Sequence, residues 1–268
     1  MLWGRWLKSN VSLKTSREDN TPIQALAALH ESASLRAVTG TFLRPAGFFL
    51  TERGLSLCGF NPGARIVDAG CGTGASVSRL RGKFRFRAMG FDLSGDLIRN
   101  NGCANPLPFA RARAEELPLP DDCCDGVLCE CVLSLLAEPE RAATEFSRIL
   151  HRGGFLILSD MYDRCRIDDS YPASTGEGGC ASILRSRTSI EKILGDAGFC
   201  LVAWEDHTRY LKELVAQMIL SGEPCAELSS LRQFFGAGSA APSGLPRSRP
   251  GYFLLVAQKL TKGDVRNG

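Results

Sequence analysis

Apolar and polar positions alternate along the middle of the chain in blocks that predict strands and helices in turn. Short apolar runs over 64–69, 86–92, 109–112, 125–131 and 155–159 have the length and character of buried strands. The segments between them carry apolar residues at helical spacing. The clearest case is 140–150, where Ala142, Phe146, Ile149 and Leu150 share one face. Strands that alternate with helices predict an α/β fold, with a parallel sheet covered on both faces.

The pattern continues on both sides of this block. We expect helices over 22–38, from Gly74 to about 81, over 95–101, 189–197 and 210–220, and strands over 199–204 and 252–257. Thr51 and Ser189 are expected to cap the helices that follow them. The Gly-, Ala-, Ser- and Pro-rich stretch 236–250 is expected to form a loop.

Composition narrows the class of protein. The 268 residues carry a net charge of only +3, and Lys and Arg do not run in blocks, so we expect no nucleic-acid partner. No apolar run reaches the ~18 residues of a membrane span, and the first residues lack a secretory signal, so we expect a cytoplasmic protein. Eleven cysteines, an odd number without a C-x-x-C pair, argue against a disulfide framework and against a zinc ribbon, and we expect no metal site.

The strongest local signal is Asp68-Ala69-Gly70-Cys71-Gly72-Thr73-Gly74, which ends one predicted strand and opens a helix. Glycines allow the sharp turn and the close approach of a ligand to backbone amides, and the helix start adds a positive dipole. Asp92 ends the second strand, where a carboxylate can accept both ribose hydroxyls of a nucleoside. The loop also satisfies a loose dinucleotide pattern, so a nicotinamide-dependent oxidoreductase stays open. Asp68 favours a cofactor with a methionine moiety over a nicotinamide cofactor, because its carboxylate suits the ammonium group of that moiety.

The motifs together resemble a known family. Asp68-x-Gly70-x-Gly72-x-Gly74, Asp92, Leu117-Pro118-x-Pro120-Asp121 with Asp125, and Leu150-x-x-Gly153-Gly154 are similar in order and spacing to class I S-adenosylmethionine (SAM)-dependent methyltransferases of the methyltransferase-11 type, over about 62–160. The resemblance implies a Rossmann-like, seven-stranded, mostly parallel sheet with helices on both faces and an antiparallel last strand. It also implies SAM as the cofactor and a small-molecule acceptor as substrate.

The resemblance implies a set of cofactor-binding residues around the loop and the next strands. They are Asp68, Gly70, Cys71, Gly72, Gly74, Asp92, Leu93, Ala114, Glu115 and Glu130. One position departs from the family, because Arg113 stands where a carboxylate would bind the adenine amino group. The amide of Ala114 could still serve there.

Three cysteines suggest what the acceptor is. Cys129 and Cys131 lie two apart at the end of the fourth strand, so both thiols are expected on one face, and Cys180 follows in a later loop. The segments around Cys131 and Cys180 resemble arsenite methyltransferases, which implies a soft element such as trivalent arsenic held by thiolates. A further family cysteine is absent, since Val77 stands there. Buried structural thiols, another small acceptor, or a non-catalytic metalloid-binding protein are the alternatives.

His207 is a candidate general base, because histidine titrates near neutral pH; a surface position beside a helix start is the alternative. The expected organisation is an N-terminal helical cap segment over 1–61, a methyltransferase domain over 62–260 and a tail over 261–268. The sequence fixes neither the oligomeric state nor the identity of the acceptor.

Overall fold

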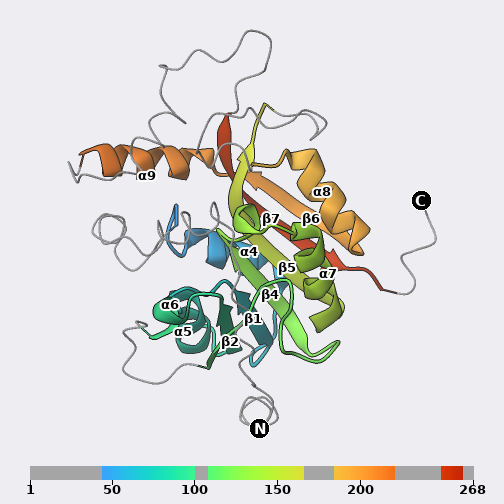
Figure 1. Cartoon of the computed structure of the whole chain (residues 1–268). Helices are drawn as coiled ribbons and strands as arrows, with labels where there is room; N and C mark the ends of the chain where they lie inside the picture. The colour runs from blue at the N-terminus through green and yellow to red at the C-terminus, as the bar shows by residue number, and fades with distance from the viewer. Residues whose placement is uncertain (1–43, 100–107, 166–183, 221–248, 262–268) are drawn as a thin grey trace.

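The computed structural model describes residues 44–99, 108–165, 184–220 and 249–261 (Figure 1). The helix expected over 22–38, most of the loop expected over 236–250, and Cys180 lie outside these ranges. None of the helices in the described ranges has the length and apolar character needed to cross a bilayer.

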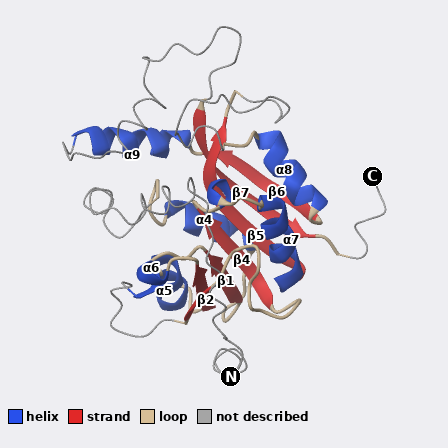
Figure 2. Cartoon of the chain, viewed as in Figure 1, coloured by secondary structure: helices blue, strands red, loops and turns tan. Residues whose placement is uncertain are grey.

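A seven-stranded sheet forms the centre of the molecule, in the order β3-β2-β1-β4-β5-β7-β6 (Figure 2). The first five strands pair in parallel, and β7 runs antiparallel to both of its neighbours, β5 and β6. The expected α/β fold with an antiparallel last strand is therefore confirmed. The strands are β1 Arg65–Ala69, β2 Arg87–Asp92, β3 Phe109–Arg111, β4 Cys124–Glu130, β5 Leu150–Asp163, β6 Phe199–Asp206 and β7 Pro250–Lys259.

Helices cover both faces of the sheet, and each face has its own cluster of buried side chains. Apolar residues of α7 and α8 pack in one cluster, and those of α4, α5 and α9 pack in the other. Figure 1 shows α7 and α8 on the near side and α4 behind the strands. The helices are α4 Phe49–Cys58, α5 Ala75–Gly82, α6 Gly95–Arg99, α7 Pro139–Ile149, α8 Arg187–Asp196 and α9 Thr208–Leu220, with a 3₁₀ turn η1 over Leu133–Leu135.

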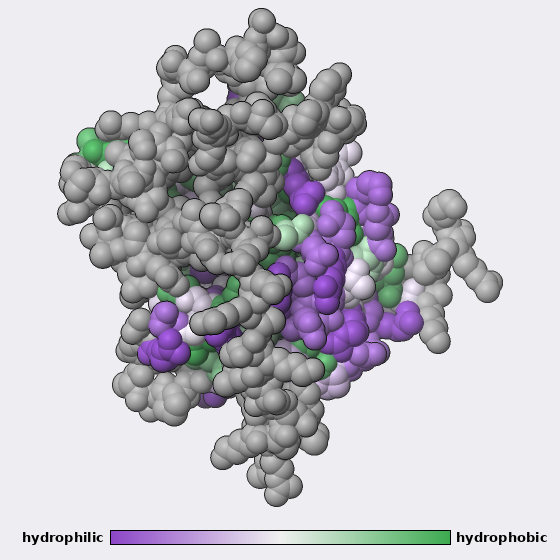
Figure 3. All heavy atoms as spheres, viewed as in Figure 1, coloured by the Kyte–Doolittle hydropathy of each residue, from purple (hydrophilic) through white to green (hydrophobic). Residues whose placement is uncertain are grey.

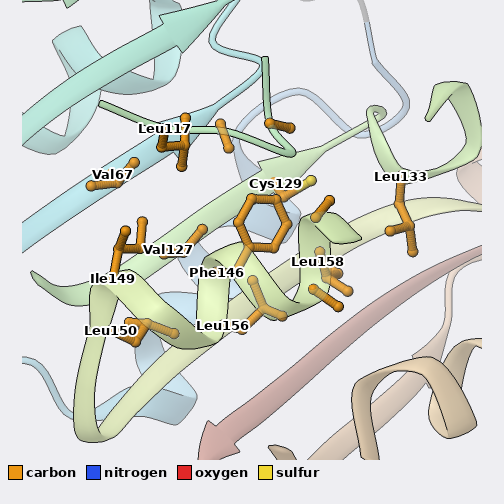
Figure 4. Packing of buried hydrophobic residues seen from close by; sticks show 14 of the residues in the cluster. Val67, Leu117, Val127, Cys129, Leu133, Phe146, Ile149, Leu150, Leu156 and Leu158 are labelled. Atoms are coloured by element: carbon orange, nitrogen blue, oxygen red, sulfur yellow. The ribbon is translucent and has the colours of Figure 1, made fainter. Parts of the chain in front are cut away.

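Helix α7 shows how the sequence pattern becomes packing. Proline occupies its first turn, where no backbone N–H is required, and two alanines followed by two large apolar residues are buried along the helix. Phe146 is fully buried and points at Cys129 and Leu158 (Figure 4). Burial of such a ring contributes roughly 2–3 kcal/mol. The outward side of the helix is polar, and the face over α7 in Figure 3 is largely hydrophilic.

Two expected helix caps are wrong. Helix α4 begins at Phe49, so Thr51 lies inside its first turn, buried, with its hydroxyl turned to a carboxylate of the sheet. Helix α8 begins before Ser189, and the side chain of Ser186 accepts the N–H of Ser189. Thr51 uses its hydroxyl for a tertiary contact with Glu130, and Ser186, three residues before Ser189, is the residue that caps α8.

Candidate active site

The glycine loop joins β1 to α5 at the carboxyl edge of the parallel strands. Gly70, Gly72 and Gly74 have φ of 84°, 53° and 81°, which an L side chain rarely adopts. A Cβ on Gly70 would lie 2.1 Å from Val132, and one on Gly74 would lie 2.0 Å from Phe109. Among the described residues, a Cβ on Gly72 would meet nothing within 4 Å. The outer glycines are thus packed closely, and no described residue fills the space in front of Gly72.

Asp92 lies beside this loop because β1 and β2 are parallel neighbours. Its Oδ2 accepts the backbone N–H of Gly72 at 2.7 Å, and its Oδ1 accepts the N–H of Ser94 at 2.8 Å. A carboxylate offers about four lone-pair positions and can accept several donors at once. The sequence expectation that this carboxylate lies at the glycine loop agrees with the structure.

Asp68 is a buried carboxyl group on β1 with an unused acceptor. Its exposed fraction is 2%, and among the residues that the structure describes no group donates to its Oδ2. Burial raises the pKa of Asp68 well above its usual value, and the neighbouring Glu130 raises it further, against the lowering effect of Arg44. A cationic or donor group brought to this oxygen would be stabilised, since it would satisfy a buried polar atom.

A buried polar network joins helix α4 to the same edge of the sheet. Arg44 pairs with Glu130 at 2.5 Å and donates to the hydroxyls of Ser76 and Thr51, at 2.9 Å each. Thr51 in turn donates to Glu130 Oε1 at 2.7 Å. Burial alone would lower the pKa of Arg44, but the carboxylate of Glu130 raises it overall, so the guanidinium keeps its charge.

This network has two consequences for the sequence expectations. Glu130, an expected cofactor residue, has its carboxylate engaged by protein donors. The sequence makes Arg44, in Leu43-Arg44-Pro45, a candidate to bind the carboxylate of SAM, with surface packing as the alternative, but its guanidinium is paired with Glu130 in the structure. A buried arginine needs a carboxylate partner, and only the folded chain identifies that partner as Glu130.

The residues expected at the adenine end divide into exposed and buried ones. Leu93 follows Asp92 and is 48% exposed, which leaves an apolar surface beside the loop. Ala114 and Glu115 are buried, and Glu115 accepts from Arg113 at 3.2 Å. Cys71 turns away from the open space, because its sulfur is 2.6 Å from where a Cβ on Gly90 would be.

Cys129 and Cys131 do not share a face. Cys129 packs in the same cluster as Phe146 on one side of the sheet (Figure 4), whereas Cys131 packs against the cluster on the other side. The alternation of a strand would place them together, but β4 ends at Glu130 and Cys131 has a left-handed φ of 56°. The expectation of two thiols turned the same way is therefore wrong.

Cys131 has a partner that the sequence did not indicate. Its sulfur lies 2.9 Å from the hydroxyl of Tyr252 on β7, and its amide donates to Ser159 O at 2.8 Å. Burial raises the pKa of the Cys131 thiol to about 12. The group is thus a protonated thiol in a polar pair, at the carboxyl end of β4.

His207 lies at the start of α9. Its Nε2 is 3.0 Å from Glu205 Oε2, and its ring contacts those of Phe49 and Tyr210. The adjacent Asp206 accepts the N–H of Thr208. The helix start with an Asp206 cap agrees with the alternative, but the surface position expected there is wrong, because the His207 side chain is only 12% exposed. In the described ranges no group of three or more His, Cys, Asp or Glu side chains is arranged to hold a metal ion.

Comparison with known proteins agrees with this geometry. Residues 67–158 match a family model described as a methyltransferase domain. The chain is 32% identical over 112 residues to the ubiquinone/menaquinone biosynthesis C-methyltransferase UbiE of Vibrio parahaemolyticus, covering 38% of this chain and 43% of that protein. It is 29% identical over 160 residues to the methyltransferase GfsG of Streptomyces halstedii, covering 56% of each. The chain thus spans about half the length of these relatives.

Solved structures share the fold. The cyclase SpnF superposes with a TM-score of 0.69 at 19% identity, covering 90% of this chain and 96% of that one. The phosphoethanolamine N-methyltransferase 2 of Haemonchus contortus, in complex with S-adenosyl-L-methionine, superposes with a TM-score of 0.67 at 17% identity, covering 85% and 56%. At these identities the likeness concerns the fold, and one of the two names is that of a cyclase.

Proposed function

We propose that this chain is a SAM-dependent methyltransferase that acts on a small acceptor. The observation that carries the proposal is the position of the Asp92 carboxylate, bonded to the Gly72 amide next to the open space of the loop. The match of 67–158 to a methyltransferase domain and the methyltransferase relatives support it. The shared fold alone does not assign methyl transfer, because a cyclase has it too.

The described residues fit the cofactor piece by piece. Asp92 would hold the ribose hydroxyls with its carboxylate oxygens at the loop, and Asp68 would hold the ammonium group with Oδ2, which has no donor among the described residues. Leu93 offers an apolar surface for adenine beside them. When bound, SAM supplies a methyl group on a positively charged sulfur, which is the electrophile of the reaction.

The protein's own part in the reaction is positioning. Cys131 and Tyr252 form a neutral polar pair at the carboxyl end of β4, where this kind of sheet binds ligands. Their weak donors would orient an acceptor rather than remove its proton, since the Cys131 thiol has a pKa of about 12. The N-terminal segment 1–61 would act as a cap over a methyltransferase domain at 62–260, and Arg44 would anchor that cap through its buried pair with Glu130.

The acceptor is the finer part of the proposal. A soft element held by thiolates would require Cys131 and Cys180, with a third thiol other than Cys129, whose sulfur packs on the opposite side of the sheet. Incubation with SAM plus arsenite, selenite or small thiols, followed by mass spectrometry, tests this version. Methylated arsenic that is lost in both Cys131→Ser and Cys180→Ser would support it, and unchanged turnover in either variant would overturn it.

Calorimetry tests the cofactor class directly. We expect SAM and S-adenosylhomocysteine to bind and NAD not to bind. Asp92→Asn should weaken S-adenosylhomocysteine binding about 10- to 150-fold, because a charge-assisted hydrogen bond to a ligand is worth about 1.5–3 kcal/mol. Asp96→Asn is the matched control, since Asp96 lies four residues later and pairs with Arg99 on the surface.

Binding of NAD alone would overturn the proposal in favour of an oxidoreductase. Binding of a metalloid without any methylated product would instead indicate a thiol-based binding protein.

A further inference from the structure

A cluster of basic residues lies where α5 ends and β2 begins (Figure 1). Five cations fall within nine residues, and a single uncharged residue stands between each cation and the next. We call this cluster the basic turn; it consists of Arg79, Arg81, Lys83, Arg85 and Arg87. All of them except Arg79 are exposed.

The basic turn is remote from the cofactor residues. Arg87 is the first residue of β2, and Asp92, at the glycine loop, is the last. The strand spans roughly 17 Å between them. The basic turn therefore lies at the amino edge of the parallel strands, and the candidate active site lies at their carboxyl edge.

The basic turn has little negative charge to balance it. Glu52 of α4 pairs with Arg79 at 2.6 Å and with Lys83 at 2.7 Å, so one carboxylate serves two cations. In the part of the chain that the structure describes, no carboxylate pairs with the other three arginines. Five cations and one carboxylate give a net charge of +4, which exceeds the +3 of the whole chain. The remainder of the chain is therefore slightly negative.

The two phenylalanines within the basic turn pack inside the protein. The Phe84 and Phe86 rings stack with their centroids 5.6 Å apart, and Phe86 is buried against Phe60. The ammonium group of Lys83 lies over the Phe84 ring, 5.3 Å from its centroid. The rings are thus engaged by the protein and offer no platform on which nucleobases would stack.

The backbone turns outward at this place. Gly82 ends α5 and is exposed, and a Cβ on it would meet nothing within 4 Å among the described residues. Arg85 has a left-handed φ of 58°, which bends the chain between the helix and the strand. Cations on an outward turn can approach a flat surface together, whereas a nucleic-acid strand is bound along a charged groove.

We propose that the basic turn docks the protein on a bilayer surface rich in anionic phospholipids. Exposed cations are attracted by the negative potential of such a surface and need no fixed pairing geometry. Each cation contributes about fivefold to binding, so a net charge of +4 gives reversible binding with a partition coefficient of about 10³ M⁻¹. The docked protein keeps the glycine loop at the edge that is turned away from the lipid.

Sedimentation of the full chain with vesicles tests the proposal. With vesicles that contain about 30% phosphatidylserine in phosphatidylcholine, we expect about half of the protein to sediment at about 1 mM accessible lipid. Vesicles of phosphatidylcholine alone should sediment none. The partition coefficient should fall more than about tenfold when the salt concentration rises from about 0.05 M to about 0.5 M, because the screening length shortens.

Variants separate the basic turn from the overall charge. The triple variant Arg81→Gln, Arg85→Gln and Arg87→Gln should lower the partition coefficient about 100-fold. Replacement of the same three arginines by lysine should keep binding within about twofold, because the potential acts on charge and not on side-chain shape.

A second triple variant is the matched control. It removes the same charge from exposed positions on α7 and α8, which pack on the opposite face of the sheet from α5. Its binding should stay within about threefold of the wild type. The control consists of Arg141→Gln, Arg187→Gln and Lys192→Gln.

Three results would overturn the proposal. They are the absence of binding to anionic vesicles, an equal loss in both glutamine variants, and binding of a single-stranded oligonucleotide or of polyglutamate about tenfold tighter than binding of the vesicles at the same salt. The last result would assign the basic turn to nucleic acid or to an acidic protein. S-adenosylhomocysteine affinity should be the same with and without vesicles, so failure here and failure of the methyltransferase proposal are distinct results.

Discussion

Replacement of Asp68 by asparagine should raise the stability of the fold while it lowers cofactor affinity. The carboxyl group is buried, and its Oδ2 has no donor among the described residues. An unsatisfied buried polar atom costs about 1–3 kcal/mol, more when charged. Asparagine has nearly the same shape and no charge, so we expect the free energy of unfolding at neutral pH to rise by about 1 kcal/mol or more, which is about 2–4 °C in Tm.

The pH dependence follows from the direction of the shift. Burial raises the pKa of Asp68 in the folded state above its unfolded value of about 4, so between the two values the folded chain binds more protons. Stability of the wild type therefore falls as pH rises through this window, and the variant lacks that loss. The advantage of Asp68→Asn should vanish below pH of about 4, where both states are protonated.

Binding should respond in the opposite sense. Loss of a charge-assisted hydrogen bond to the ammonium group costs about 1.5–3 kcal/mol, or about 10- to 150-fold in affinity for S-adenosylhomocysteine. The bound ammonium would lower the raised pKa of Asp68, so binding to the wild type should release protons and tighten as pH rises. Calorimetry in two buffers of different ionisation enthalpy measures this release, which should be absent in Asp68→Asn.

Asp160→Asn is the matched control, because Asp160 is equally buried but both of its carboxylate oxygens accept hydrogen bonds from the protein. Its oxygens accept from Ser134 N, Ser134 Oγ and Met161 N. The amide group of asparagine would face one of these donors, so this variant should lose about 1–3 kcal/mol of stability. If Asp68→Asn lost stability as Asp160→Asn does and bound S-adenosylhomocysteine like the wild type, the role given to Asp68 would be refuted.

Three further predictions concern the scaffold around the loop. Gly74→Ala should lower stability by about 2–3 kcal/mol in thermal unfolding, because its Cβ would overlap the Phe109 ring and its φ is left-handed; a loss under about 0.5 kcal/mol would contradict this. Arg44→Met should cost about 3–5 kcal/mol in denaturant unfolding, since it leaves the Glu130 carboxylate buried without its cation, and a double variant that also carries Glu130→Gln should recover part of the loss. Asp125→Asn should destabilise the fold at neutral pH but not in acid, and equal melting shifts at pH 7 and pH 3 would argue against this. Burial would raise the pKa of the Asp125 carboxyl, but the arginine and histidine that donate to it lower the pKa overall. The stabilisation by this carboxylate is therefore present above pH of about 4 and is lost as pH falls through the lowered pKa.

The positions of the strands along the chain were predictable from the sequence because each carries its own local signal, whereas the antiparallel direction of the last strand came only from the resemblance to the methyltransferase family. Strands β1 and β2 and helix α5 begin and end within about one or two residues of the predicted bounds. The position of Asp92 at the loop was predictable too, since parallel neighbouring strands end at the same edge. Strand β5 extends further than predicted, over 14 residues, because residues 160–163 pair with β7 and Leu150, which was predicted to lie in a helix, pairs with Cys124 of β4.

The features that the sequence did not predict depend on contacts between distant segments. The hydroxyl of Thr51 satisfies Glu130 instead of a helix end, and no local pattern distinguishes these two uses. The left-handed backbone at Cys131 reverses the alternation that its position implies. Tyr252 reaches the same place from a strand more than a hundred residues later in the chain.

The position of β7 between β5 and β6 determines the order in which the sheet can be assembled. During synthesis β6 emerges before β7, and its only hydrogen-bonded neighbour in the described sheet is β7. The half formed by β1 to β5 can pair as it leaves the ribosome, whereas β6 must wait for a partner that is separated from it by a long connection, and such non-local closure is slow. The edge that carries the glycine loop should therefore mature first, and β6 should stay without its sheet neighbour until β7 has been made.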